Sequence, residues 1–231
     1  GSPNRSWNTP LSRDTNLVGH WKFDETSGNT AYDYSGHGYN GTINGATQTT
    51  TSYNERNLYF DGSNDYVVTP AFSIPNTNGV LTISAWVNCT SQSFGQTILN
   101  DGGWSNTVGY IWFSRKLSNT YAVFDFSTGS ARSSFTTPVE LFVDNQWVLI
   151  STVVDYNNKN IKFYKNGLLF HIAITGNNML FPDRLSAKYV SSYNGGSGFS
   201  LQGYLDDVRI YNRGLSAEEI SEIYNQTKGK Y

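Results

Sequence analysis

The chain has 231 residues, of which 38% are hydrophobic and 15% are aromatic, with 16 Tyr, 13 Phe and 6 Trp. This aromatic content excludes general disorder, and the length allows a sizeable core without the help of a metal or a disulfide. The formal net charge is -2, from 16 basic and 18 acidic residues without a basic run, which excludes nucleic acid as a partner.

Strand patterns recur along the chain, with turn residues between them. In chain order, the predicted strands cover residues 17–23, 57–60, 66–68, 81–87, 108–113, 121–126, 147–154, 161–164 and 204–211. The fifth and sixth strands, and likewise the seventh and eighth, are close enough in sequence to form hairpins. Asn166-Gly167 follows the eighth strand and predicts a type I′ turn.

A single helix is predicted near the C-terminus, over residues 216–225. Ser216 and Glu219 have the spacing of a capping box, and Ile220 and Ile223 follow at helical spacing. Many strands and one short helix predict an all-β sandwich. No linker-like segment divides the chain, so we expect one domain over residues 1–231, in which residues 1–6 are the remnant of an expression tag and a flexible start.

Eight short segments, taken together and in this order, match a known family. They are residues 19–25 followed by 27–28, then 33–42, 60–67, 82–87, 146–148, 163–167, 203–213 and 215–220. They resemble the laminin-G-like jelly rolls of the concanavalin A-like lectin/glucanase superfamily, in the group found in bacterial surface proteins. The resemblance implies two curved antiparallel sheets in a jelly-roll β-sandwich. It also implies a module that binds glycans or proteins at cell surfaces, often with a structural calcium ion.

Acidic and amide side chains provide candidate calcium ligands, since calcium takes six to eight oxygen ligands. Asp24 follows the first strand, and Asp206 and Asp207 lie in the last one. In jelly rolls of this kind the first and last strands come together, so these acids would repel each other without a cation or hydrogen bonds. The Gly- and Asn-rich loop over residues 33–42 adds Asn40 as a further ligand.

Other roles for these acids stay open. Asp24 and Asp33 are also typical of residues that cap turns. Asp206 has the alternatives of pairing with Arg209 or bonding to backbone amides. Asp61 and Asp65 form a second, weaker calcium candidate, for which the turn interpretation is favoured.

Aromatic side chains in loops are candidates for a sugar platform, which needs apolar contact and a few well-placed polar groups. Trp104 and Tyr193 lie in Gly-rich loops, whereas Trp21, Trp86 and Trp147 lie in apolar strands and are predicted to be core residues. Further candidate ligand-binding residues are Tyr110, Trp112, Arg115, Asp125 and Asn194.

Catalytic motifs are lacking in the sequence. The Glu-x-Asp-x-x-Glu pattern of related glucanases does not occur, nor does a Gly-x-Ser-x-Gly elbow or a phosphate-binding loop. Glu218, Glu219 and Glu222 belong to the predicted helix. Acidic side chains near a helix N-terminus interact favourably with the positive end of the helix dipole. The single cysteine, Cys89, excludes an internal disulfide and a Cys-based zinc site. No apolar stretch approaches the length of a membrane span, so no membrane insertion is expected.

The sequence therefore predicts a noncatalytic carbohydrate-binding module with a structural calcium ion. Its partner would be a polysaccharide or glycan, and the module would be a monomeric part of a larger extracellular or cell-surface protein. One alternative is a protein-binding adhesion module of the same fold, whose partner would be a cell-surface protein. Another is a glycosidase or lyase with an unrecognised site.

Overall fold

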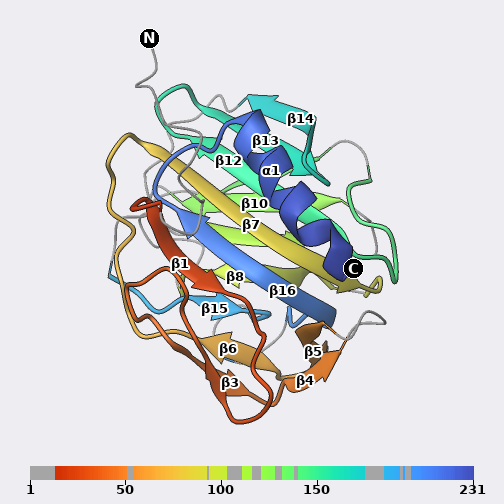
Figure 1. The fold of residues 1–231 in the computed structure, drawn as a ribbon. Coiled ribbons are helices and arrows are strands. Elements are labelled where there is room, and N and C mark those ends of the chain that lie inside the picture. The colour runs from red at the N-terminus through yellow and green to blue at the C-terminus, as the bar shows by residue number, and fades with distance from the viewer. Residues whose placement is uncertain are drawn as a thin grey trace.

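The structure, a computed structural model, describes residues 14–50, 55–92, 94–102, 111–115, 121–127, 132–137, 140–174, 185–192, 195 and 199–231. Within these residues, two antiparallel sheets of eight strands each pack face to face (Figure 1). The jelly-roll sandwich predicted from the sequence is therefore confirmed. We call the sheet that carries the helix the front sheet and the other the back sheet.

The front sheet has the strand order β14-β13-β12-β7-β16-β5-β4, and β1 also pairs with β16. Its strands are β1 (Leu17–Trp21), β4 (Thr47–Thr50), β5 (Arg56–Asp61), β7 (Val80–Cys89), β12 (Val148–Asp155), β13 (Asn160–Lys165), β14 (Leu168–Ile174) and β16 (Gln202–Tyr211). The back sheet has the order β11-β10-β9-β8-β15-β6-β3-β2. Its strands are β2 (Thr30–Ala31), β3 (Gly41–Asn44), β6 (Tyr66–Val68), β8 (Gln96–Asn100), β9 (Ile111–Arg115), β10 (Ala122–Ser127), β11 (Arg132–Thr136) and β15 (Tyr189–Val190).

Local sequence signals explain the connections. The two predicted hairpins are present as the pairs β9–β10 and β12–β13. Asn166 and Gly167 both have positive φ, 51° and 82°, as a type I′ turn requires, and they join β13 to β14. The segment around Asp61 and Asp65, for which a turn is favoured, joins β5 to β6, which lie in different sheets, so the chain crosses the sandwich there.

Alternation along the strands separates the core from the front face. In β7, Ile83, Ala85 and Val87 point into the core between the sheets, whereas Ser84 and Trp86 alternate with them and face the front. Burial of the apolar side chains between the two sheets is the main force that holds the sandwich together.

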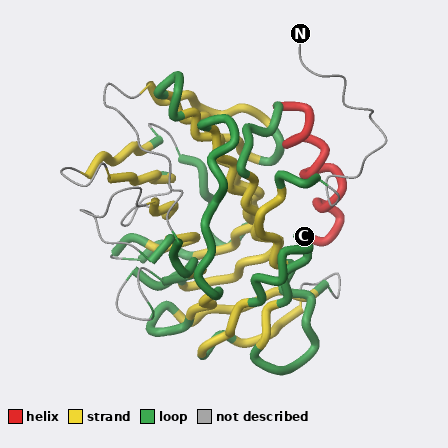
Figure 2. The backbone as a smooth tube through the Cα atoms, turned by 90° about the vertical axis from the view of Figure 1, so that its left-hand side faces the viewer, coloured by secondary structure: helices red, strands yellow, loops and turns green. Residues whose placement is uncertain are grey.

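The helix α1 (Ala217–Thr227) covers part of the front sheet (Figures 1 and 2). Ser216 and Glu219 form the predicted capping box in full. Ile220 and Ile223 pack on front-face residues in a second apolar cluster that includes Trp86. A 3₁₀ turn over Lys228–Lys230 then brings the chain along the uncovered part of the sheet.

Strand β16 organises the region of interest. One edge pairs with β7, and the other edge pairs first with β5, through residues 202–205, and then with β1, through residues 208–211. Asp206 and Asp207 lie at the junction, where the register shifts and Asp207 has a φ of 50°. Two acidic residues are thereby placed next to the gap between β1 and β5.

Candidate functional site

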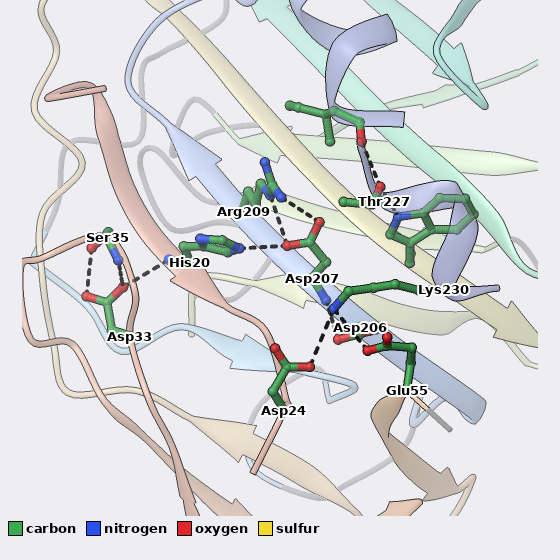
Figure 3. Close-up of polar contacts among 12 residues, drawn as sticks. His20, Asp24, Asp33, Ser35, Glu55, Asp206, Asp207, Arg209, Thr227 and Lys230 are labelled. Atoms are coloured by element: carbon green, nitrogen blue, oxygen red, sulfur yellow. Dashed lines mark hydrogen bonds and ion pairs between the residues drawn. The ribbon is translucent and has the colours of Figure 1, made fainter. Parts of the chain in front are cut away.

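The predicted metal ligand Asp207 lies in a buried ion-pair cluster (Figure 3). Its Oδ1 is 2.6 Å from Nε2 of His20 on β1 and accepts from Nε of Arg209 at 3.0 Å, and its Oδ2 accepts from Nη2 of Arg209 at 2.8 Å. Burial alone would raise the pKa of Asp207. The neighbouring Arg209 and His20 outweigh this effect and hold that pKa well below its usual range. The carboxylate is thus ionised and fully engaged.

His20 completes this cluster in its neutral form. Burial lowers the pKa of His20 below its usual value, although the hydrogen bond to Asp207 opposes this effect. A neutral imidazole that donates through Nε2 has an unprotonated Nδ1, and no described residue bonds to that atom. Arg209 is therefore the full positive charge that compensates Asp207.

Asp206 has a different environment from its neighbour. Its Oδ1 accepts from the backbone N–H of Asp207 at 2.8 Å, and its Oδ2 bonds to the hydroxyl of Tyr231. Burial, together with the charge of Asp207, raises the pKa of Asp206 well above its usual range. The protein environment therefore favours the protonated carboxyl group.

Asp24 faces a lysine instead of a second acid. Nζ of Lys230 lies 3.5 Å from Oδ1 of Asp24 and 3.8 Å from Oε2 of Glu55 (Figure 3). Burial alone would lower the pKa of Lys230, but the neighbouring Asp206 and Asp24 raise it. The fourth predicted ligand, Asn40, accepts from the backbone N–H of Asp33 at 2.9 Å. Asp33 itself accepts from the backbone N–H groups of His20, Ser35 and Tyr39, as a turn-capping residue does.

These residues do not fit a calcium site. The guanidinium of Arg209 already occupies one side of the Asp207 carboxylate, and a divalent cation beside it would be repelled. The ammonium group of Lys230 lies near Asp24 and Asp206, where the predicted cation would be needed. The described residues contain no group of three or more His, Cys, Asp or Glu arranged to hold a metal ion.

The ion pairs predict that calcium does not stabilise the protein through Asp24, Asp206 and Asp207. Thermal unfolding in excess calcium and in EGTA should give the same melting temperature, because native charges from Arg209 and Lys230 compensate the acids. A calcium ion bound to the native state at a hundredfold excess over its Kd would add about 2.7 kcal/mol. A rise in melting temperature with calcium that Asp206→Ala abolishes would contradict this expectation.

The second calcium candidate is a turn. Oδ2 of Asp65 accepts from the backbone N–H of Asp61 at 3.0 Å, and Oδ1 of Asp61 accepts from that of Ser63 at 2.8 Å. Both carboxyl groups therefore stabilise the crossing from β5 to β6, in agreement with the turn interpretation.

Most of the predicted sugar-binding residues are not tested by the part of the chain that the structure describes. Trp104, Tyr110, Tyr193 and Asn194 lie outside the described residues, and only the backbone of Trp112 is described. Asp125 is fully buried in β10.

Arg115 is buried too. Its guanidinium bonds to the carbonyl oxygen of Cys89, the Ser91 hydroxyl and the Asp144 carboxylate. Phe113 lies on the same face of β9 as Arg115, and Phe113 belongs to the core. This face of the strand therefore points inward. These contacts give Arg115 a structural role in holding two loop segments. Burial raises the pKa of the Cys89 thiol, as expected for an inert core cysteine.

An aromatic hollow, which sequence reasoning missed, lies on the front sheet beyond the end of α1. It has a volume of about 210 Å³, and its lining residues are Thr49, Thr50, Asn57, Asn88, Trp147 and Tyr204. We call it the front hollow. Strands β4, β5, β7 and β16 contribute five of these residues, and Trp147 directly precedes β12. Trp147, which was predicted to be a core residue, packs against the second apolar cluster but is only half-buried and borders the hollow.

Ring contacts build one wall of the front hollow. The centroids of Trp147 and Tyr204 are 6.1 Å apart, and Tyr204 lies 5.0 Å from Tyr59 on the neighbouring strand. Tyr231 packs on Trp147 at 4.6 Å and on Trp86 at 4.2 Å. The hydrogen bond of Tyr231 to Asp206 thus connects the acidic junction to this aromatic wall.

Comparisons with known proteins identify the fold. The sequence profile of a laminin G family, the concanavalin A-like lectin/glucanases superfamily, matches residues 61–221. No curated protein matches the sequence significantly. No helix among the described residues has the length and apolar character needed to cross a membrane.

Solved structures with a similar fold are receptor-binding domains of botulinum neurotoxins. The serotype G binding domain gives a TM-score of 0.70 at 14% identity, over 92% of this chain and 51% of that chain. The serotype D ligand-binding domain was solved in complex with N-acetylneuraminic acid. It gives a TM-score of 0.65 at 14% identity, over 93% of this chain and 52% of that chain. The present chain therefore spans about half the length of these structures, and at this identity the likeness concerns the fold alone.

Proposed function

The chain belongs to the concanavalin A-like lectin/glucanases superfamily of laminin G-like jelly rolls, and from this premise we propose that it is a noncatalytic carbohydrate-binding module. The observation that carries the proposal is the front hollow, in which a half-buried tryptophan and a half-buried tyrosine border amide and hydroxyl side chains. Sugar recognition needs this combination: apolar contact for the C–H face of the ring and polar groups for its hydroxyls.

The lining of the front hollow supports a binding role over a catalytic one. Glycosidases use a pair of Asp or Glu residues that flank the scissile bond. The six lining residues include no carboxylate, histidine or cysteine. The nearest acid along β16, Asp206, is buried and bonded to Tyr231. We propose an extracellular or cell-surface location to accompany this role, where polysaccharides and glycans are available as partners.

A protein-binding adhesion module is the second candidate, and the edge strand β14 favours it. Leu168 and Ile174 on this strand are 71% and 81% exposed, and Leu169 and Ile172 are also exposed. An exposed apolar edge strand offers unpaired backbone groups and apolar contacts to a partner chain. Such a partner would bind at the side of the front sheet away from the front hollow, since β14 and β4 lie at opposite ends of the strand order.

A glycan and polysaccharide array, run with calcium and with EGTA, tests the proposal. We expect binding to at least one glycan and the same pattern in both buffers. Binding that disappears in EGTA would support the calcium hypothesis against the ion-pair geometry. An absence of binding to every glycan in both buffers would contradict carbohydrate binding and favour the protein-binding role of β14.

A further inference from the structure

The uncharged lining of the front hollow narrows the class of sugar that it takes; this inference rests on the proposed function. All six lining residues are uncharged. Trp147 and Tyr204 supply ring surface, and the other four supply amide or hydroxyl groups. A ligand in this hollow therefore meets apolar surface and neutral hydrogen-bonding groups.

Several of these polar groups are available to a ligand. Among the residues that the structure describes, none bonds to the indole N–H of Trp147, the hydroxyl of Tyr204 or the side-chain amide of Asn88. Asn57 accepts from the Thr49 hydroxyl at 2.5 Å, which fixes the orientation of its amide. The hollow thus combines donors and acceptors in the manner that sugar hydroxyls require, since each hydroxyl both donates and accepts.

Charged residues neighbour the lining along β5 and β16, but none of them lines the hollow. Arg56 precedes Asn57 and pairs with Thr50, but its side chain is not part of the lining. Asp206 lies two residues from Tyr204 on β16, and its environment favours the protonated carboxyl group. The nearby cation, Lys230, faces the carboxylates of Asp24 and Glu55. Recognition of a carboxylate or sulfate normally uses an arginine or lysine that can bond to it, and no such residue lines the hollow.

We infer that the front hollow binds one pyranose unit of an uncharged saccharide, with Trp147 against its C–H face, and that it discriminates against sialic and uronic acids. Sites for drug-sized ligands have volumes of about 300–1,000 Å³, so a hollow of about 210 Å³ suits a single sugar unit within or at the end of a longer chain. This differs from the acidic sugar in the structure of the serotype D toxin domain.

Isothermal titration with matched saccharides tests this inference. Lactose and 3′-sialyllactose form one pair, and cello-, xylo-, manno- and chito-oligosaccharides are compared with oligogalacturonate. We expect at least one uncharged saccharide to bind, and Trp147→Ala to weaken it by roughly tenfold or more, because the ring contact is lost. Sialyllactose and oligogalacturonate should bind more weakly than their uncharged counterparts.

Two further variants keep the test independent of folding. Asn88→Ala removes a polar group from the hollow without removing a large side chain, and it should also weaken binding. Tyr66→Ala removes a half-buried tyrosine from β6 of the back sheet and should leave binding unchanged. Circular dichroism of each variant confirms that the fold is retained.

The outcomes separate the inference from the proposed function. Binding of the acidic saccharides that Trp147→Ala removes would overturn the charge selectivity and leave carbohydrate binding intact. Binding that neither Trp147→Ala nor Asn88→Ala affects would overturn the assignment of the front hollow. An absence of binding to every saccharide on the array and in the titrations would overturn both.

Discussion

Replacing Asp207 with asparagine is expected to reduce the free energy of unfolding by about 3–5 kcal/mol at neutral pH, since it breaks a buried ion pair and leaves one charge behind. The charge left behind is the guanidinium of Arg209, which loses its carboxylate partner and keeps at most one amide oxygen as acceptor. His20 then shares that single oxygen with Arg209 or faces the amide N–H group. Urea unfolding of the wild type and the variant measures the difference.

The effect of Asp207 should depend on pH in a defined direction. Its pKa in the folded state lies below the value of about 3.9 in an unfolded chain. The unfolded state therefore binds the proton first, so the stabilisation is present above about pH 4 and declines as the pH falls further. The difference between wild type and Asp207→Asn should accordingly shrink below about pH 4.

Asp206→Asn is the matched control, one residue away. The pKa of Asp206 is raised, so its contribution to stability is present below about pH 4 and is lost as the pH rises through the folded-state pKa. An asparagine resembles the protonated acid, so Asp206→Asn should retain or increase stability at neutral pH. Equal losses in the two variants would contradict the different environments that we describe.

A double variant isolates the ion pair. Combining Asp207→Asn with Arg209→Met removes both charges, and its cost should be smaller than the sum of the two single costs because no buried charge is left alone. Additive costs would show that Arg209 and Asp207 contribute to stability independently.

Gly203→Ala is expected to destabilise the protein by about 2–4 kcal/mol, from backbone strain and overpacking together. Gly203 has a φ of 146°, which disfavours other residues. An added Cβ would lie 2.2 Å from the carbonyl oxygen of Asn88 and 2.6 Å from Cα of Cys89. Strand β7 would have to move away from β16, and denaturant unfolding should detect the loss.

The same substitution should also weaken saccharide binding, since Asn88 and Tyr204 flank the displaced backbone and both line the front hollow. Gly229→Ala is the control, because no atom lies within 4 Å of its added Cβ. A Gly203→Ala variant with wild-type stability would show that β7 and β16 separate at little cost.

Local chemistry made much of the fold predictable. The capping box of Ser216 and Glu219 and the turn at Asn166-Gly167 each depend on residues a few positions apart, so they could be read directly. Core strands such as β7 alternate clearly enough to be located. Short polar strands such as β4, with the sequence Thr-Gln-Thr-Thr, give no such signal and were missed.

The front hollow could not be predicted because its residues come from strands that are distant in sequence. Trp147 and Leu149 are two residues apart, so alternation places them on the same face of the sheet, and α1 covers Leu149. This alternation was the only sequence signal for the burial of Trp147. The sequence does not show that α1 ends at Thr227, before it reaches Trp147.

The acidic junction was predicted only in part. The sequence brought Asp24, Asp206 and Asp207 to one place, and the structure agrees. It did not show that the positive φ of Asp207 interrupts the alternation of β16, so that Asp207, and not Asp206, pairs with Arg209. Which aspartate pairs with Arg209 depends on tertiary geometry. Two adjacent aspartates give no sequence signal that distinguishes them.

The position of Asn88 in the front hollow has a practical consequence for production of the protein. Asn88-Cys89-Thr90 is an acceptor sequence for N-linked glycosylation. In a eukaryotic secretory host, a glycan attached to Asn88 would fill the hollow from within and compete with any added saccharide. Protein from a bacterial cytosol avoids this modification, and so does a Thr90→Ala variant, which keeps the Asn88 amide. A module that binds sugar from one host and fails to bind it from another would be explained by this single side chain.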